Sequence, residues 1–306
     1  MIRSVCIAGG GVIGSLFAGH LARVCEVSVL TRRPEHAAAL EREGLRVSGR
    51  SDHTASVRAS VDPAELGEPE LVIVACKGTD LEAVSERLEG AFPGATAMTV
   101  QNGLGAEEVV GRHGPWPLVS SVTFMSGTRH ADTHVEYILD TATWLGPYRG
   151  ASYEYCEEIA ELIRSSGLKA EAFADLRPSQ WSKLIFNATV NAVAALTGLP
   201  HDFHFAEQEQ LWDLGHLVRD LVDEGKAVAA AAGVELGEDP WEMNLLATRR
   251  GHWHYPSMLE DVDARRRTEV DTITGALVRE AERLGVPAPL HTAVYRLVKA
   301  KEASYL

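Results

Sequence analysis

The chain has 306 residues, of which 45% are hydrophobic and 24% are charged, and this length and composition predict a soluble globular protein of two domains. Its formal net charge is −14 at pH 7, from 43 acidic and 29 basic residues, which argues against nucleic acid or an anionic membrane surface as the main partner. The four cysteines are widely separated and form no CxxC pair, so the sequence predicts neither a structural disulfide nor a zinc site.

The N-terminus begins at once with a strand pattern and lacks the charged leader and small-residue cleavage site of a signal peptide. No apolar run reaches the ~18 residues that a membrane span requires. Cysteines in apolar segments fit a reducing compartment. These features predict a cytoplasmic protein that spans no membrane.

The first thirty residues predict a nucleotide-binding unit. Residues 4–8 form a short apolar run typical of a buried strand, and residues 15–24 have the apolar content of a helix. The glycine-rich turn GGGVIG at 9–14 lies between them, and residues 26–30 predict a second strand. This order of strand, turn, helix and strand is the context that a dinucleotide-binding fingerprint requires.

Three glycines in that turn have the spacing GxGxxG. We expect Gly9 to permit the tight turn, Gly11 to let the backbone approach a pyrophosphate, and Gly14 to let the helix pack on the strand. Val12 and Ile13 lie between them, and we assign all five residues to cofactor binding. The alternative is a glycine-rich turn that binds no ligand.

The end of the second strand indicates which dinucleotide is bound. NAD sites usually place a carboxylate there to accept a hydrogen bond from the ribose 2′-hydroxyl, whereas this chain has Thr31, Arg32 and Arg33. Guanidinium groups suit a 2′-phosphate because they form charge-assisted, bidentate contacts. The sequence therefore favours NADP (NADPH), with Arg32 as the main contact; the alternative is a solvated pair of arginines.

Further strands alternate with helical segments up to about residue 175. Lys77 follows the strand at 70–75 and Asn102 follows the strand at 95–100, so both side chains are expected at the carboxyl edge of a parallel sheet, where dinucleotides bind. We predict cofactor contacts for both. Other segments complete this part of the chain: a short hairpin of residues 45–48 and 55–59, strands at 118–124, 143–145 and 169–173, and a helix at 153–165.

After Asp175 the pattern changes to nearly all helix, with helical runs at 178–199, 211–232 and 265–284. We therefore predict an α/β Rossmann-type N-terminal domain followed by an all-α C-terminal domain. The first, residues 1–175, is an NADP-binding Rossmann-like domain, and the second, residues 176–306, is a helical substrate and catalytic domain. No linker separates them, and we expect a ligand-binding cleft between them.

The helix predicted at 178–199 is apolar on nearly every side, yet it carries Lys183, Asn187 and Asn191 at i, i+4 and i+8. We call these three residues the polar row. Burying an ammonium group and two carboxamides costs several kcal/mol unless partners or a ligand satisfy them. The polar row is therefore expected to line a ligand site; the alternative is a structural network that joins two helices.

Several motifs together resemble the ketopantoate reductase (2-dehydropantoate 2-reductase) family over essentially the full length. The resemblance implies a Rossmann domain and a helical domain that reduce ketopantoate, a 2-oxo acid, to pantoate with NADPH, on the way to pantothenate and coenzyme A. The motifs are GGGVIG at 9–14, CK at 76–77, QNGLG at 101–105, WSKLIFNATVN at 181–191 and PSMLEDVDARRRTEVDTITG at 256–275.

The resemblance also implies roles for individual residues. Lys183 matches the catalytic lysine that polarises and protonates the keto oxygen, and Glu269 matches an acid near the reacting centre. Asn187, Asn191 and Ser257 match residues that bind the substrate. Hydride transfer to a ketone builds negative charge on its oxygen, so a protonated lysine can stabilise that charge and deliver a proton, and no metal is needed.

Lys77 and Asn102 match residues at the nicotinamide ribose end of the cofactor. Two features depart from the family pattern. His254 stands where several members have asparagine, and residues 125–137, MSGTRHADTHVEY, replace a more usual loop of small residues after a strand. We assign His254 to the border of the substrate site, with a loop histidine that makes no substrate contact as the alternative.

Two other functions stay open at this point. The chain could reduce a different 2-oxo acid or ketone in a specialised pathway, or it could be a non-catalytic NADPH sensor. Lys183 and Glu269 argue against a sensor, because a binding module has no need of a proton donor. The oligomeric state is also open, with a homodimer as one expectation.

Overall fold

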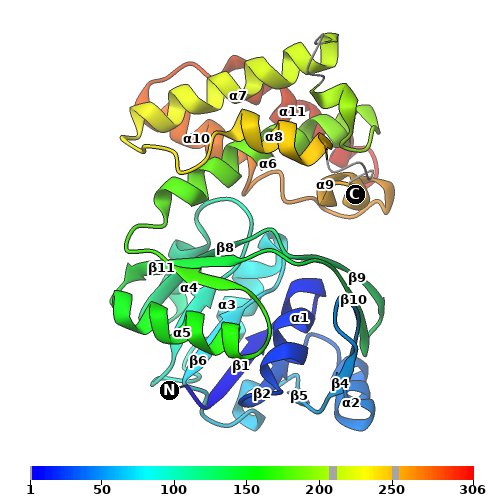
Figure 1. The fold of residues 1–306 in the computed structure, drawn as a ribbon, viewed down its shortest axis with the longest axis vertical. Helices are drawn as coiled ribbons and strands as arrows, with labels where there is room; N and C mark the ends of the chain where they lie inside the picture. Colours follow the sequence, from blue (N-terminus) through cyan, green and yellow to red (C-terminus); the bar gives the residue numbers. More distant parts are fainter. Residues whose placement is uncertain (1, 207–211, 250–254) are drawn as a thin grey trace. The chain divides into compact units, whose positions relative to one another are not determined.

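The computed structural model describes residues 2–206, 212–249 and 255–306 (Figure 1). Contacts divide the chain into two compact units, and the segment Asn102–Gly105 belongs to the second although the first surrounds it in sequence. Unit 1 is Met1–Gln101 with Ala106–Leu176, and unit 2 is Asn102–Gly105 with Arg177–Leu306.

Unit 1 is built on an eight-stranded sheet of order β12-β11-β8-β7-β6-β1-β2-β5. The six strands from β8 to β5 run parallel, β11 is antiparallel to β8, and β12 pairs parallel with β11. This parallel arrangement with helical crossovers is the Rossmann-type fold that the sequence predicts. The strands are β1 (Ser4–Ala8), β2 (Glu26–Leu30), β5 (Arg58–Ser60), β6 (Leu71–Val74), β7 (Thr96–Thr99), β8 (Leu118–Thr123), β11 (Thr143–Arg149) and β12 (Ala170–Ala172).

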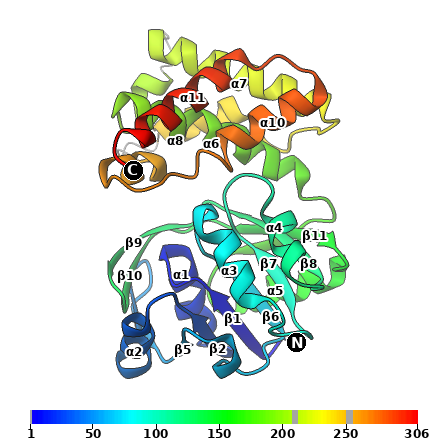
Figure 2. The ribbon, with the colours of Figure 1, turned by 180° about the vertical axis from the view of Figure 1, so that it is seen from behind.

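Alternate residues of the strands face opposite sides of the sheet, and helices cover both sides. Val5 and Ile7 of β1 pack in a core with α1 and α5, whereas Cys6 and Ala8 pack in a second core with α3 and α4. Figures 1 and 2 show α5 on one face and α3 and α4 on the other. The helices of unit 1 are α1 (Val12–Leu21), α2 (Pro34–Glu43), α3 (Leu81–Leu88), α4 (Ala106–His113) and α5 (Tyr153–Ser165).

A second, four-stranded sheet of order β4-β3-β10-β9 packs on the side of α1 away from the main sheet. Gly19 of α1 permits this close approach, because a Cβ there would lie 2.4 Å from a methyl group of Val47. The small sheet therefore encloses α1 between two layers. Its strands are β3 (Leu45–Gly49), β4 (His53–Ala55), β9 (Ser126–Ala131) and β10 (His134–Leu139).

Two of our sequence-based predictions are wrong in this region. The predicted partner strand at 55–59 is divided: β4 ends at Ala55, and β5 begins at Arg58 and joins the main sheet beside β2. Residues 125–137, read as a loop, contain β9 and most of β10. β9 is mostly exposed, so its sequence lacks the apolar alternation from which a half-buried strand is recognised.

Two of the three glycines of the GxGxxG fingerprint are needed for steric reasons. Gly9 has a φ of +118°, and a Cβ there would lie 2.6 Å from the backbone nitrogen of Cys76. A Cβ on Gly14 would lie 1.9 Å from the carbonyl oxygen of Gly9, whereas one on Gly11 would meet nothing within 4 Å. The helix begins at Val12, three residues earlier than predicted, because the turn itself supplies its first residues.

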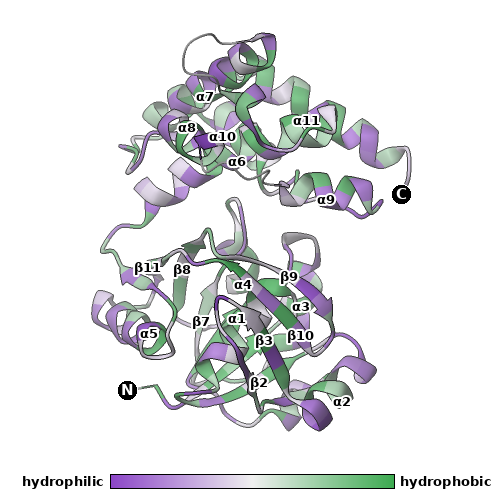
Figure 3. Cartoon of the chain, turned by 45° about the vertical axis from the view of Figure 1, so that its right-hand side comes forward, coloured by the Kyte–Doolittle hydropathy of each residue, from purple (hydrophilic) through white to green (hydrophobic). Residues whose placement is uncertain are grey.

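Unit 2 is helical and is organised around α6, which contacts all five of the other α-helices found among its described residues. Nearly every residue of α6 from Trp181 to Ala195 is buried, as the sequence predicts, and the helix ends before Gly198, whose φ is +72°. Figure 3 shows the apolar residues along α6 in green. The helices of unit 2 are α6 (Arg177–Thr197), α7 (Asp213–Ala231), α8 (Pro240–Arg249), α9 (Ser257–Asp263), α10 (Thr274–Leu284) and α11 (Pro289–Ala303).

The prediction of a helix at 265–284 is wrong for residues 265–273. Helix α10 begins at Thr274, and residues 264–273 form turns and irregular backbone in which Arg265 has a φ of +52°.

All four cysteines are free thiols. None of the described helices has the length and apolar character needed to cross a bilayer.

The glycine turn gives a test of the fold with an internal control. We expect Gly14→Ala to destabilise the protein by ~1–3 kcal/mol or more, because the new methyl group overlaps the carbonyl of Gly9. Gly11→Ala, in open space at a φ of −77°, should cost less than about 1 kcal/mol. Urea unfolding of the two variants measures the difference; equal losses of stability would contradict the packing role of Gly14.

Candidate functional site

The polar row lies in the buried part of α6. Lys183, Asn187 and Asn191 are only 8, 9 and 7% exposed, which confirms that these groups are buried. They share one side of the helix because successive members are four residues apart. The arrangement places one amine and two carboxamides in a line within the apolar interior of unit 2.

Burial changes the acidity of the amine. Loss of hydration lowers the pKa of Lys183 from its ordinary value of 10.5 to about 8, and the nearby carboxylate of Glu269 opposes this by stabilising the charged form. The amine is therefore close to half protonated at a mildly alkaline pH. A group of this acidity can both hold and release a proton near neutrality.

Glu269 lies in the turn between α9 and α10 and is partly buried. Its carbonyl oxygen accepts hydrogen bonds from the backbone N–H groups of Thr272, at 3.1 Å, and Ile273, at 3.0 Å. Its carboxylate accepts a hydrogen bond from the carboxamide of Asn102, at 3.2 Å. The structure thus brings together Lys183, Glu269 and Asn102, which the sequence places far apart.

The segment Asn102–Gly105 is held against the same turn through its backbone. The N–H of Leu104 donates to the carbonyl oxygen of Thr272 at 3.1 Å. Gly103 has a φ of +95°, and a Cβ there would lie 1.8 Å from that same oxygen. Gly103 of QNGLG therefore serves a close backbone approach within unit 2, which its position after a predicted strand does not reveal.

The other two residues that the sequence analysis assigns to the substrate are Ser257 and His254. Ser257 is the first residue of α9, a helix that packs against α6, and its side chain is exposed. His254 lies outside the described residues. The substrate role of both residues accordingly rests on the family resemblance.

In unit 1, the two arginines after β2 have different surroundings. The side chain of Arg32 is 78% exposed and lies 3.6 Å from the carboxylate of Asp80. Arg33 pairs with Asp132 at 2.5 Å. Arg32 is therefore the more available of the two for an anionic ligand.

The carboxyl ends of β6 and β7 are joined by a side chain that we did not single out from sequence. The amide of Gln101 donates to the carbonyl oxygens of Val74, at 2.8 Å, and Cys76, at 2.9 Å. Lys77 follows directly and is exposed. Gln101 thus fixes the backbone on which Lys77 and Asn102 stand.

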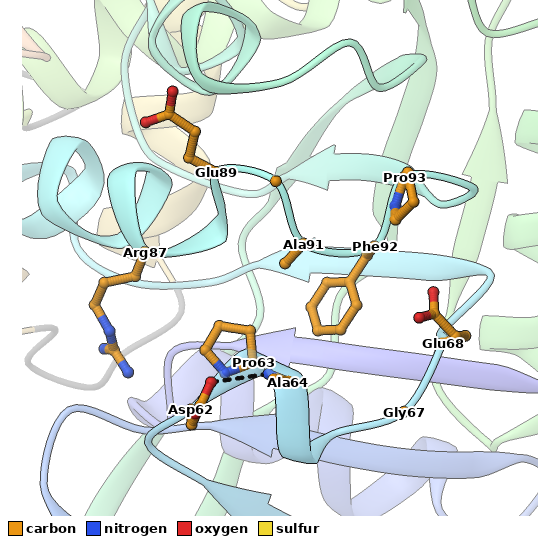
Figure 4. Close-up of a pocket in the computed structure, with 11 residues that line it drawn as sticks. Asp62, Pro63, Ala64, Gly67, Glu68, Arg87, Glu89, Ala91, Phe92 and Pro93 are labelled. Atoms are coloured by element: carbon orange, nitrogen blue, oxygen red, sulfur yellow. Dashed lines mark hydrogen bonds between the residues drawn. The ribbon is translucent and has the colours of Figure 1, made fainter.

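Unit 1 also has a surface hollow of about 400 Å³, formed by residues 62–68 and 87–93 (Figure 4). It contains no candidate site residue. Arg87 at its border donates to the carbonyl oxygens of Thr31 and Val61, which ties α3 to the ends of β2 and β5. We interpret this hollow as a structural feature of the segments that precede β6 and β7.

The described residues contain no cluster of three or more histidine, cysteine or carboxylate side chains that could hold a metal ion. The groups that they do bring together are an amine of lowered pKa, a carboxylate beside it, and neutral carboxamides. Such a set can donate a proton to a polar substrate and hold it through hydrogen bonds.

Comparisons with known proteins agree over both units. The family model described as ketopantoate reductase PanE/ApbA matches residues 5–150, and its C-terminal model matches residues 175–302. A 2-dehydropantoate 2-reductase of Pyrococcus abyssi is 26% identical, with 98% of each chain covered.

Solved structures share the fold. A PanE/ApbA family ketopantoate reductase from Ralstonia eutropha has a TM-score of 0.89 at 26% identity, with 99% of each chain covered. D-mandelate dehydrogenase in complex with NADH and anilino(oxo)acetate has a TM-score of 0.88 at 23% identity, again with 99% of each chain covered, a likeness that concerns the fold alone.

Proposed function

Because the chain belongs to the ketopantoate reductase family of oxidoreductases, we propose that it reduces 2-dehydropantoate (ketopantoate) to pantoate with NADPH, a step of pantothenate and coenzyme A biosynthesis. The observation that carries the proposal is the buried amine of Lys183, with a carboxylate beside it and two carboxamides on the same side of α6. This set of groups matches what reduction of a small 2-oxo acid requires of a protein.

The cofactor supplies the hydride when it is bound, and the chain supplies the proton. We propose that the ammonium group of Lys183 donates a hydrogen bond to the keto oxygen, stabilises the negative charge that develops there, and then transfers its proton. Glu269 favours the charged amine before the reaction, while burial favours the neutral amine after it. A pKa of about 8 lies near the optimum for such a transfer close to neutral pH.

The substrate carboxylate and hydroxyl group would be held by neutral donors. We assign this role to Asn187, Asn191 and Ser257, and we extend it to His254 at the border of the site. Carboxamide and hydroxyl groups hydrogen-bond a small anion without the desolvation cost of another buried charge. Selectivity then comes from the number of hydrogen bonds that a given 2-oxo acid completes.

The residues of the glycine turn fit a dinucleotide, because Gly11 leaves open space where a pyrophosphate would approach the N-terminus of α1. We assign Gly9, Gly11, Val12, Ile13 and Gly14 to this contact. The other cofactor residues that we propose are Arg32 for the 2′-phosphate and Lys77 and Asn102 for the nicotinamide ribose. Residues 1–175 are thus proposed as the NADP-binding domain and residues 176–306 as the substrate domain.

NADPH preference is expected to depend on Arg32. Arg32→Ala should raise KM for NADPH about tenfold or more and leave KM for NADH nearly unchanged, because only NADPH carries the 2′-phosphate. Arg33→Ala, which removes a guanidinium already paired with Asp132, is the matched control and should have a smaller effect. Steady-state kinetics with both cofactors measure this; an equal loss for NADH and NADPH in Arg32→Ala rules out the phosphate assignment.

Lys183→Met separates chemistry from binding, since methionine keeps roughly the shape and removes the proton donor. We expect turnover to fall at least ~10²-fold while NADPH still binds, as measured by fluorescence titration. In the unaltered enzyme, the rate of reduction should fall as pH rises through about 8, because the protonated amine is the reactive form. Near-normal turnover in a folded Lys183→Met protein would remove this mechanism.

The substrate is tested by comparing ketopantoate with its deoxy analogue 3,3-dimethyl-2-oxobutanoate, which lacks only its hydroxyl group. A site that hydrogen-bonds that hydroxyl should reduce ketopantoate with a kcat/KM at least ~10²-fold higher. Equal rates, unchanged in His254→Asn, would favour the alternative of a reductase for another 2-oxo acid or ketone. Cofactor binding without reduction of any acid in a panel would favour the NADPH sensor.

Two further assignments accompany the proposed function. A homodimer and a cytoplasmic location both stay predictions. Light scattering of the purified chain determines the first, and cell fractionation determines the second.

A further inference from the structure

Helix α11 contacts the turn that carries Glu269 on both sides of that residue. Tyr295, Lys299 and Glu302 occupy positions i, i+4 and i+7, so they lie on one side of α11. We call these three residues the α11 clamp. All the groups that they hold belong to the segment between α9 and α10.

On the N-terminal side, the α11 clamp holds Thr268, the residue directly before Glu269. One carboxylate oxygen of Glu302 accepts hydrogen bonds from both the N–H and the hydroxyl of Thr268, each at 2.6 Å. Glu302 is 2% exposed and Thr268 is 1% exposed. A buried carboxylate that accepts two hydrogen bonds fixes the backbone that donates them, since losing either bond leaves a buried group unsatisfied.

On the C-terminal side, the α11 clamp holds Asp271, two residues after Glu269. Tyr295 donates its hydroxyl hydrogen to one carboxylate oxygen of Asp271 at 2.8 Å, and the ammonium of Lys299 lies 2.8 Å from the other. Lys299 also lies 3.2 Å from Glu302, so it links the two sides. Arg279 of α10 adds a hydrogen bond to the carbonyl oxygen of Asp271 at 2.9 Å.

We propose that the α11 clamp is a positioning device for the reaction: by fixing Thr268 and Asp271, it holds the carboxylate of Glu269 beside the amine of Lys183. None of its three residues is assigned to substrate or cofactor. The inference rests on the proposed function only in that Lys183 is taken as the proton donor. Its immediate consequence is that loosening the α11 clamp weakens the effect of Glu269 on Lys183.

Loosening the α11 clamp should lower the pKa of Lys183, because Glu269 is the group that raises it. Lys299→Met gives a test with an unambiguous sign. Removing a positive charge acts through space to raise the pKa of another lysine, so a lowered pKa would show displacement of Glu269 and not the loss of the charge itself. Tyr295→Phe loosens the same contact without any change of charge.

Lys301→Met is the matched control. Lys301 is on the same helix and makes a comparable hydrogen bond, at 2.7 Å, but its partner is the carbonyl oxygen of Ala195 on α6. The variant removes the same charge without touching the turn of Glu269. Glu269→Gln is the positive control, since it removes the carboxylate itself.

The measurement is an NMR pH titration of the full chain with ¹³C-labelled lysine, in which Lys183→Met assigns the Lys183 signal. We expect Lys299→Met and Tyr295→Phe to lower the pKa of Lys183 by ~0.5 units or more, in the direction of Glu269→Gln, and Lys301→Met to leave it unchanged or higher. An unchanged pKa in folded Lys299→Met and Tyr295→Phe, or an equal fall in Lys301→Met, overturns the proposal.

Turnover gives a second measurement with its own pattern. A fall of ~0.5 units from about 8 reduces the protonated fraction of Lys183 about two- to threefold at pH 8.5 but hardly at pH 6.5, so the loss of kcat should appear only at the higher pH. A general structural defect would reduce kcat at both pH values. If the unaltered chain reduces no 2-oxo acid, the proposed function fails, and the NMR titration still decides whether the α11 clamp positions Glu269.

Discussion

The constraint on which unit 2 depends is the burial of an amine within a helix that is otherwise apolar. An isolated ammonium group in such surroundings costs several kcal/mol, and the protein reduces this cost by lowering the pKa of Lys183 and by placing Glu269 near it. Neither adjustment is complete. The result is an amine whose two protonation states are close in free energy near neutral pH, which is the property that a proton donor requires.

That balance makes the position of Glu269 critical, because the interaction between two charges in a low-dielectric interior varies steeply with their separation. A carboxylate on a free loop would adopt many positions. Here the turn is closed by its own backbone hydrogen bonds, by the α11 clamp and by Asn102, whose carboxamide holds the carboxylate directly. The irregular backbone before α10 is therefore held by several hydrogen bonds, although it has no regular repeat.

The sequence predicts the elements that follow a simple periodic rule and fails where that rule does not apply. Strands β1 and β2 and helix α5 have the predicted bounds, because continuous apolar runs and helical periodicity mark buried elements clearly. The exposed strand β9 carries no such signal. The apolar spacing of 265–284 continues through the turn of Glu269, where Val270 and Ile273 are buried as they would be in a helix, so periodicity alone cannot show that the backbone is not helical.

The residues of the candidate site could be named from the sequence, but their partners could not. The spacing of Lys183, Asn187 and Asn191 predicts a common side of one buried helix, and in the structure α6 contains all three and buries each of them. Neither the contact of Asn102 with Glu269 nor that of Thr268 with Glu302 follows from any local pattern, since these pairs are 167 and 34 residues apart. Such contacts are decided by tertiary packing.

The segments that carry Asn102 and Glu269 each have a buried carboxylate nearby that accepts several hydrogen bonds. Glu107 follows Asn102 by five residues, and its side chain is a buried carboxylate. It accepts hydrogen bonds from the hydroxyls of Thr99, at 2.9 Å, and Ser120, and so joins α4 to β7 and β8. The turn that carries Glu269 is held in the same way by the buried carboxylate of Glu302, which accepts two hydrogen bonds from Thr268. A buried carboxylate with several donors resists movement, because each broken bond would leave it poorly satisfied in a low-dielectric site. In each of these two places, a buried carboxylate thus fixes the backbone next to a partly exposed polar side chain.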